Sequence, residues 1–262
     1  MERQRPTVLV TGAAGRIGSA FRLAMGGMFR FRLADLAAAT LADTPGAGHE
    51  AVRLDIRDAD AVRAACAGAD AVLHLAADPS PEADWETSLL PVNVQGTLHV
   101  LRGAAQAGCA RVVLASSLHV VGGYPLDRPI PHDAPPRPAN LYGASKAAGE
   151  ALGAVFAARG MTVIAVRIGA YDAPWLHDDP PPGAGEASAY VSARDLNGLL
   201  ARCLTWPVSG FHTVYGVSGN RPNRVDLAGT RALLGYAPVD DGFEALGVLR
   251  PGAGQECVAP RR

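Results

Sequence analysis

The sequence contains almost no lysine. Of its 24 lysine and arginine residues, Lys146 is the only lysine. Lysine presents a compact charge with rotatable donors, whereas arginine is a wide planar fork, so the two are not interchangeable in a confined site. A chain that uses arginine everywhere else and keeps one lysine indicates a functional requirement at position 146.

An excess of charge of one sign is also lacking. The net charge is -1, and the arginines are scattered along the chain without a run. A protein that binds nucleic acid or an anionic membrane usually carries a basic patch, so we expect neither partner.

Long apolar runs are missing as well. No stretch reaches the length of a membrane span. The apolar run in the opening MERQRPTVLV is too short for the apolar region of a signal peptide. These absences predict a cytoplasmic protein.

Cysteines are few and widely spaced. The four, Cys66, Cys109, Cys203 and Cys257, form no CxxC pair. A disulfide framework or a structural zinc site has no basis in this spacing, so we predict reduced cysteines and no metal.

Short apolar runs rich in β-branched residues alternate with segments of helical composition. Most of the runs are apolar throughout, as in strands that are buried on both faces of a parallel sheet. This alternation predicts right-handed βαβ units and a doubly wound α/β fold. The predicted strands are 7–11, 30–35, 51–54, 71–77, 111–117 and 162–169, the predicted helices are 15–28, 58–67, 84–107, 141–159 and 192–205, and the Pro-rich stretches 125–140 and 171–189 are predicted loops.

A glycine-rich loop, TGAAGRIG, follows the first predicted strand and opens a helix. Gly12, Gly15 and Gly18 allow a tight turn and a close approach of the backbone to a pyrophosphate at the helix N-terminus. Asp35 ends the second strand about 20 residues on, where a carboxylate binds ribose hydroxyls. This acid would repel the 2′-phosphate of NADP, so we expect NAD, although Arg16 and Arg32 lie nearby in the sequence.

A candidate acid/base pair lies in LYGASK. Tyr142 and Lys146 are four residues apart, which places both side chains on one face of a helix. An ammonium beside a phenol stabilises the phenolate, so we expect Lys146 to lower the pKa of Tyr142. Ser117 ends a predicted central strand, where open α/β sheets bind ligands, and can hold the reacting oxygen.

With these motifs in this order, and with LDIRD, LHLAA and NVQGT between them, the chain resembles the extended short-chain dehydrogenase/reductase superfamily, also called the NAD-dependent epimerase/dehydratase group. Within it, RLADL, ASSLHVVGGYP, VRIG and LLGYAPVDD are similar to uronate dehydrogenase. The resemblance implies that Tyr142 is the acid/base, that Lys146 binds the nicotinamide ribose, and that Ser117 orients the substrate. It implies cofactor contacts at Gly12, Ala14, Gly15, Arg16, Ile17, Gly18, Asp35, Leu36, Asp55, Ile56, Leu75, Ala76, Ala77, Asn93, Tyr142, Lys146 and Ile168, and substrate contacts at Ser80, Ser117, Leu118, His119, Tyr142 and Ala170.

The resemblance also implies an architecture. We expect a Rossmann-type domain over residues 1–170, which binds NAD and carries the catalytic residues, with a small substrate-binding portion, 171–262, packed on it as one unit. The superfamily pairs the helix of the YxxxK motif across a dimer interface, so we expect a homodimer.

The positions that bind uronate in the resembled family are altered. Leu118 replaces an amide, Ala170 replaces a hydroxyl, and Gly185 stands where an arginine clamps the uronate carboxylate. We therefore predict an NAD-dependent oxidation of a C1 hydroxyl to a lactone on a small free sugar or sugar acid, with a neutral sugar among the candidates. An NAD-dependent epimerase, which uses the same three residues without net NADH release, and a non-catalytic NAD sensor are the alternatives.

Overall fold

The protein is built on one parallel β-sheet. The structure, a computed structural model, describes residues 5–41, 48–172 and 182–251. Seven strands form the sheet in the order β3-β2-β1-β4-β5-β6-β9, and every neighbouring pair is parallel. This arrangement confirms the predicted doubly wound α/β fold. The strands are β1 (Thr7–Thr11), β2 (Arg30–Asp35), β3 (Glu50–Arg53), β4 (Ala71–His74), β5 (Arg111–Ser117), β6 (Thr162–Ile168) and β9 (Phe211–Gly216).

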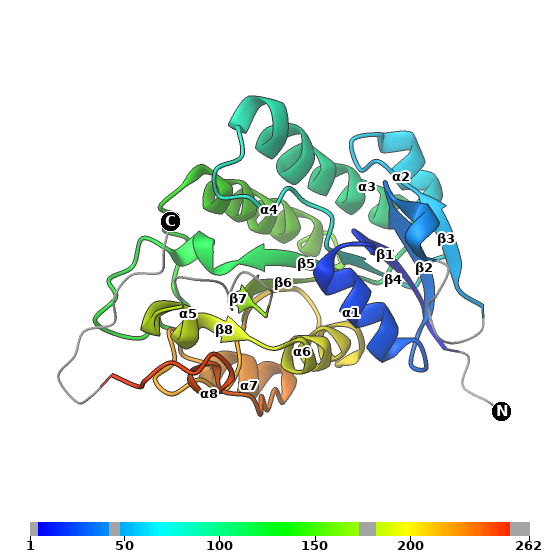
Figure 1. The fold of residues 1–262 in the computed structure, drawn as a ribbon. Coiled ribbons are helices and arrows are strands. Elements are labelled where there is room, and N and C mark those ends of the chain that lie inside the picture. Colours follow the sequence, from blue (N-terminus) through cyan, green and yellow to red (C-terminus); the bar gives the residue numbers. More distant parts are fainter. Residues whose placement is uncertain (1–4, 42–47, 173–181, 252–262) are drawn as a thin grey trace.

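Helices cover both faces of the sheet (Figure 1). The helices α2, α3 and α4 pack together on one face, and α1 and α6 pack together on the other. The strands between them are therefore shielded from water, and every residue of β6 is buried. The five helices are α1 (Arg16–Met25), α2 (Ala59–Cys66), α3 (Thr97–Ala107), α4 (Leu141–Ala157) and α6 (Ala193–Thr205).

The predicted strands and helices match the structure to within three residues at each end, and two of the differences have a physical reason. Strand β4 ends at His74 instead of residue 77, because its partner β1 ends at Thr11, opposite His74, and the chain turns away at Gly12. The predicted helix 84–107 consists of a π-helical segment, η2 (Trp85–Gly96), that continues into α3. Pro91 lies inside η2 and has no N–H to donate, which favours the departure from α-helical bonding there.

The chain beyond residue 170 holds elements that the sequence patterns did not predict. Within the predicted loop 171–189, residues Ala184–Ala189 form helix α5, so that prediction is wrong there; Glu186 caps the helix by accepting from the Gly183 amide at 3.0 Å. Strand β9 was also missed, because FHTVYG is only partly buried and forms no continuous apolar run. The remaining elements are β7 (Ala170–Tyr171), β8 (Tyr190–Val191), α7 (Ala228–Leu234) and α8 (Gly242–Ala245).

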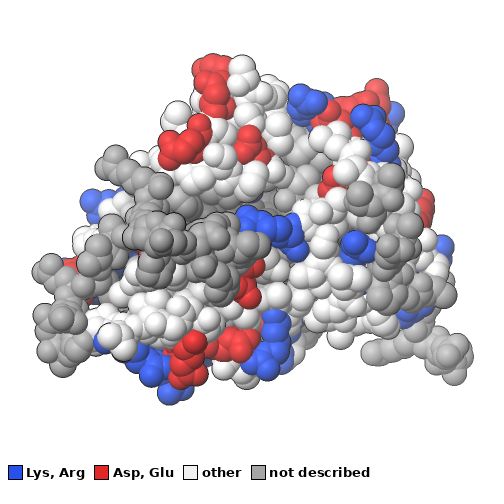
Figure 2. All heavy atoms as spheres, viewed as in Figure 1, with Lys and Arg blue, Asp and Glu red and all other residues white. Residues whose placement is uncertain are grey.

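The surface carries mixed charge. On the face in Figure 2, acidic and basic side chains are interspersed, and neither sign gathers into a broad patch. Among the described residues, no helix combines the length and the apolar character that a membrane crossing needs.

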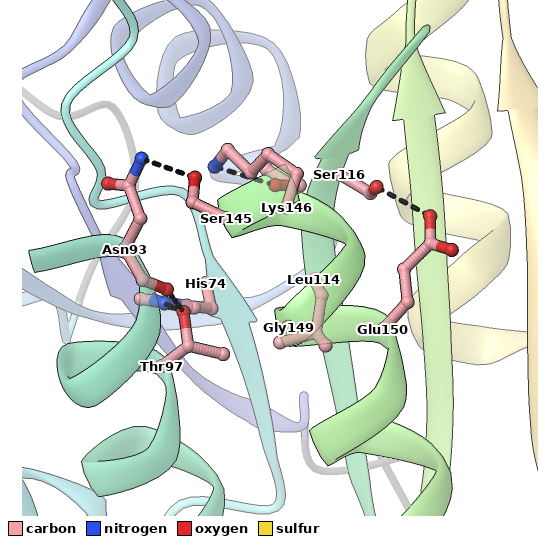
Figure 3. Close-up of a pocket in the computed structure, with 10 residues that line it drawn as sticks. His74, Asn93, Thr97, Leu114, Ser116, Ser145, Lys146, Gly149 and Glu150 are labelled. Atoms are coloured by element: carbon pink, nitrogen blue, oxygen red, sulfur yellow. Dashed lines mark hydrogen bonds between the residues drawn. The ribbon is translucent and has the colours of Figure 1, made fainter. Parts of the chain in front are cut away.

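A buried ion pair joins α4 to β6. The Glu150 carboxylate accepts from both Nε and Nη2 of Arg167 at 2.9 Å, and from the Ser116 hydroxyl of β5 at 2.6 Å (Figure 3). Both charged side chains are at least 95% buried, and Arg167 also donates to the Ala134 carbonyl at 2.8 Å. These contacts fix α4 against the sheet and hold the Pro-rich loop 125–140 to its edge.

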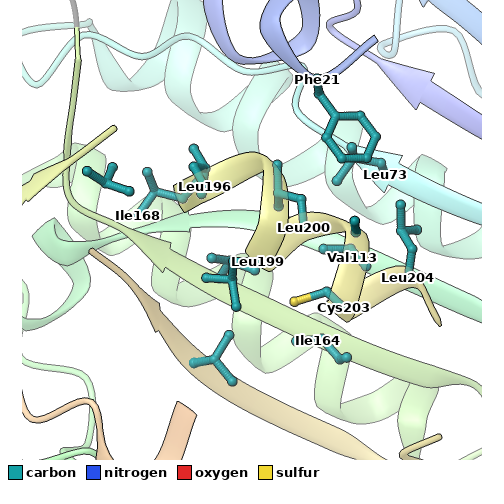
Figure 4. Packing of buried hydrophobic residues seen from close by; sticks show 14 of the residues in the cluster. Phe21, Leu73, Val113, Ile164, Ile168, Leu196, Leu199, Leu200, Cys203 and Leu204 are labelled. Atoms are coloured by element: carbon teal, nitrogen blue, oxygen red, sulfur yellow. The ribbon is translucent and has the colours of Figure 1, made fainter. Parts of the chain in front are cut away.

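The apolar core lies on both faces of the sheet. On one face, Leu196, Leu199 and Leu200 of α6 pack toward Val113 and Ile164 of the central strands (Figure 4). The cysteines at 66, 109 and 203 are buried and free, and burial raises the pKa of Cys66 and of Cys203 to about 12; Cys257 lies outside the described residues. These thiols are therefore packing groups without nucleophilic character at neutral pH.

Replacing Glu150 with Gln should strongly destabilise the fold, because Arg167 would remain buried with its charge uncompensated. We expect a loss of about 3 to 5 kcal/mol in the free energy of unfolding by urea denaturation. The matched control is Asp60→Asn, which breaks the exposed pair with Arg63 and should cost at most about 1 kcal/mol. Equal losses in the two variants would contradict a structural role for the buried pair.

Candidate active site

The structure brings Ser117, Tyr142 and Lys146 together at the carboxyl end of β5. Ser117 is the last residue of that strand, and the other two lie one turn apart on α4. Lys146 Nζ lies 5.7 Å from the centroid of the Tyr142 ring, and the Ser117 hydroxyl is near enough to the Tyr142 phenol to lower its pKa. The three groups can therefore act on one substrate oxygen.

The start of α4 is fixed against the loop that follows β5. Asn140 caps the helix by accepting from the Gly143 amide at 2.8 Å, and its amide group donates to His119 Nδ1 at 2.9 Å. A Cβ at Gly143 would lie 2.3 Å from the His119 carbonyl oxygen, so only glycine permits this approach. The His119 ring in turn meets the Tyr142 ring edge-on at 5.3 Å, which orients the phenol.

Lys146 points inward. Its Nζ donates to the Ala115 carbonyl at 3.0 Å, and burial lowers the pKa of Lys146 to about 8. Beside it lies a small polar cavity of about 10 Å³, lined in part by Asn93, Ser145 and Glu150 (Figure 3). A cavity of this size has room for about one water and none for a guanidinium, which explains why lysine is kept here.

The pKa of Tyr142 is raised, contrary to the predicted lowering by Lys146. Burial of the phenol is the largest cause, and the nearby Ser117 hydroxyl opposes it by lowering the pKa. The negative charge of Asp78 raises the pKa further. The phenol is therefore held in its protonated form, since desolvation of the ring outweighs the stabilisation of a phenolate.

The glycine-rich loop fits a dinucleotide. Gly12 has a φ of +71°, and a Cβ there would lie 2.6 Å from the Ala76 amide nitrogen; a Cβ at Gly18 would lie 2.4 Å from the Gly12 carbonyl. Helix α1 begins after Gly15, and no side chain caps its first turn, so backbone donors are available to a pyrophosphate. The cradle can thus be filled by a phosphate and not by a side chain.

Asp35 braces this loop from the end of β2. Its carboxylate accepts from the Ala14 amide at 2.9 Å and from the Ala37 amide at 3.0 Å. A carboxylate has about four lone-pair sites, so capacity remains to accept from ribose hydroxyls. Arg16 and Leu36 beside it are exposed.

The other predicted cofactor positions lie along the same carboxyl edge of the sheet. Leu75, Ala76 and Ala77 follow β4, Asp55 and Ile56 follow β3, Ile168 ends β6, and Asn93 lies in η2. Asp55 is paired with Arg57 at 2.6 Å, which lowers the pKa of the Asp55 carboxyl through hydrogen bonds to that residue.

Sequence reasoning missed His74, which links β1 and β4 to the first residue of α3. The Thr97 hydroxyl donates to the Asn93 carbonyl at 2.6 Å, so it can only accept from His74 Nε2 at 3.1 Å. His74 Nδ1 must then accept from the Thr11 hydroxyl at 2.7 Å, which requires a neutral ring. Burial is the main reason that the pKa of His74 falls to about 3. A polar residue within the apolar run LHLAA was its only signal in the sequence.

Asp78 is a second residue near the site that the sequence did not indicate. It follows β4, and its backbone is clamped by Asn93, which accepts from the Asp78 amide at 2.8 Å and donates to its carbonyl at 3.0 Å. No motif marked it, because its position depends on where β4 ends.

Only some of the residues predicted to contact the substrate lie beside Ser117. Leu118 and His119 directly follow Ser117, and Ala170 opens β7, which pairs with β8. Ser80 is exposed, and its hydroxyl accepts from the Glu82 amide at 3.2 Å within a tight loop. Gly185 lies in α5, so the carboxylate clamp of the resembled family has no counterpart at that position.

A parallel sheet with a glycine cradle after its first strand and a Ser-Tyr-Lys set at its carboxyl edge defines a dinucleotide-dependent enzyme. The chain belongs to the NAD dependent epimerase/dehydratase family, whose model matches residues 8–193. This confirms the family that the motifs predicted.

Known relatives cover nearly the whole chain. The NAD-dependent glucose-6-phosphate dehydrogenase of Haloferax volcanii is 36% identical over 252 residues, covering 90% of this chain and 94% of the relative. The L-arabinose 1-dehydrogenase (NAD(P)(+)) of the same organism is 39% identical over 259 residues, covering 89% and 96%. The structure of uronate dehydrogenase from Agrobacterium tumefaciens superposes with a TM-score of 0.81 at 32% identity, covering 95% of this chain and 92% of that one, and a variant of it complexed with NAD gives the same values.

Stability should fall in mild acid because of His74. The folded-state pKa is about 3, whereas the unfolded value is near 6.5, so the unfolded chain binds the extra proton as the pH drops below 6.5. The free energy of unfolding should then decrease by up to about 1.4 kcal/mol per pH unit from this group. Urea denaturation of the wild type and His74→Gln between about pH 7.5 and about pH 5 tests this. Parallel pH curves for the two proteins would contradict it.

Replacing Gly12 with Ala should weaken NAD binding. The added Cβ meets the Ala76 amide, and the positive φ disfavours any side chain. We expect the dissociation constant for NAD, measured by calorimetry, to rise about tenfold or more. Gly27→Ala is the control, because a Cβ at Gly27 meets nothing within 4 Å and should leave NAD affinity unchanged.

Proposed function

We propose that the protein is an NAD-dependent dehydrogenase that oxidises the C1 hydroxyl of a small free sugar or sugar acid to a lactone. The observation that carries this proposal is the placement of Ser117, Tyr142 and Lys146 at the sheet edge that also bears the glycine cradle. The resemblance to sugar dehydrogenases over about nine tenths of the chain supports it.

The chain's own residues provide binding and proton transfer. Ser117 Oγ accepts from the His119 amide at 3.2 Å, which leaves its proton to donate to the Tyr142 oxygen or to the substrate oxygen. The Tyr142 oxygen first gives its own proton to solvent water, and as a phenolate it then takes the proton of the C1 hydroxyl. NAD, when bound, supplies the acceptor for the hydrogen that leaves C1 with its electron pair.

The ammonium of Lys146 favours this proton transfer. Because its charge lies over the Tyr142 ring, it stabilises the phenolate that burial disfavours. The buried pair of Glu150 and Arg167, which also binds Ser116, keeps α4 and β5 at a fixed separation. The acid/base group and the oxygen-binding hydroxyl are therefore oriented before the substrate arrives.

The broader organisation belongs to the same proposal. We place the substrate-binding portion at residues 171–262, because α5 and β8 adjoin Ala170 beside the site. A homodimer through α3 and α4, which pack together on one face, and a cytoplasmic location complete the proposal. Gel filtration with light scattering tests the dimer.

Tyr142→Phe should abolish sugar-dependent formation of NADH while leaving the affinity for NAD within about twofold of the wild type. The phenol oxygen is the proton acceptor, whereas the cofactor cradle lies on another element. NADH absorbance with a panel of aldoses and uronates measures the first quantity, and calorimetry measures the second. Tyr236→Phe, which loses a hydroxyl bonded to the Val217 carbonyl, is the control and should retain activity.

Two results would redirect the proposal. Interconversion of two sugars without net NADH would favour the epimerase. Binding of NAD with no reaction on any sugar, in the wild type as in the variant, would favour the sensor.

A further inference from the structure

The segment after β4 carries a carboxylate into the active-site region. Asn93 holds the Asp78 backbone through two hydrogen bonds, and its amide also donates to Ser145 Oγ at 3.2 Å. Ser145 in turn donates to the Tyr142 carbonyl at 2.7 Å. A continuous set of contacts thus fixes Asp78 relative to the helix turn that carries the acid/base tyrosine.

Two hydrogen bonds orient the Asp78 carboxylate and leave part of its acceptor capacity free. One oxygen of Asp78 accepts from the Ser80 amide at 3.0 Å, and the other accepts from the Ser88 hydroxyl at 2.5 Å. Each oxygen can accept more than one hydrogen bond, so acceptor capacity is left. Within the described ranges no lysine, arginine or histidine forms an ion pair with Asp78, and its charge is felt at Tyr142, whose pKa it raises.

Two arginines that could bind an anion, Arg128 and Arg194, already form ion pairs with aspartates. Arg128 is paired with Asp127 at 3.1 Å, and Arg194 with Asp240, and both arginines are largely exposed. Gly185 offers no side chain at the position of the family's clamp. Neither these two arginines nor the Gly185 position therefore offers a free cationic partner to a sugar acid.

We propose that Asp78 is a specificity-determining residue, whose carboxylate accepts a hydrogen bond from a hydroxyl of a neutral aldose and repels an anionic sugar acid. This inference rests on the proposed dehydrogenase function. In a hexuronate bound with C1 at Tyr142, the carboxylate lies one sugar ring away from the phenol on which the charge of Asp78 acts, and a partly buried site screens charges less than water does. Like charges at this separation disfavour binding, whereas the hydroxymethyl group of the matching aldose carries no charge.

The test compares substrates that differ only at C6. NADH formation is measured with glucose against glucuronate and with galactose against galacturonate, for the wild type and for Asp78→Asn. We expect kcat/KM of the wild type to favour the aldose of each pair by about tenfold or more, and Asp78→Asn to lower that preference by about tenfold. The amide keeps the size of the side chain and removes its charge.

Two control variants separate charge from structure. Ser88→Ala removes a hydrogen bond to Asp78 and keeps the carboxylate, so the aldose-to-uronate ratio should stay unchanged even if both values fall. Glu82→Gln removes one negative charge from an exposed position of the same loop and should also leave the ratio unchanged. A ratio that moves equally in all three variants would overturn the proposal, because the effect would then come from loop structure or net charge.

Saturation-transfer NMR with NAD present measures the binding of each sugar apart from its turnover. It therefore distinguishes failure of the dehydrogenase function from failure of charge selection by Asp78. If the wild type turns over uronates as well as aldoses, charge selection by Asp78 is wrong and the dehydrogenase function stands. If no sugar is turned over but aldoses bind, and uronates bind only to Asp78→Asn, the dehydrogenase function is wrong and the charge selection stands. If neither class binds, both are wrong.

Discussion

The active site depends on the burial of one ammonium group where β5 ends. Lys146 donates to the Ala115 carbonyl and faces a cavity with room for about one water. A buried charge is tolerated only where polar groups surround it, so this contact fixes α4 against β5. Tyr142 lies one turn earlier on the helix and Ser117 two residues further along the strand, so the position of the ammonium sets both. An arginine would require a larger cavity, which accounts for the single lysine of the chain.

Further polar contacts keep that arrangement rigid. Helix α4 is tied to η2 through Ser145 and Asn93, and to β5 and β6 through Glu150. The neutral ring of His74 connects β1 and β4 to Thr97 of α3, whose hydroxyl donates in turn to Asn93 of η2. Because each donor and acceptor in these contacts has a defined partner, the network specifies one arrangement of the strands and helices around the site.

The parts of the site that local spacing encodes could be predicted, and the parts that depend on distant register could not. The four-residue interval of Tyr142 and Lys146 and the glycine triplet are local signals, and the structure places them as expected. His74 acquires its role only because it pairs with Thr11 across β1 and β4, sixty-three residues apart. The short helix α5 escaped prediction because it lies within a Pro- and Gly-rich stretch whose composition predicts a loop.

Chemistry and substrate choice come from different elements of this fold. The proposed acid/base set, Ser117, Tyr142 and Lys146, lies on β5 and α4. Asp78 and Gly185 lie on segments that follow β4 and β7. Relatives of similar identity are named for a phosphorylated and for a neutral sugar, so membership in the family does not fix the charge of the substrate. The charges around the pocket must then decide it. In this chain the Asp78 carboxylate has no ion-pair partner among the described residues, and Gly185 offers no side chain to clamp an anion, so an uncharged sugar suits both positions.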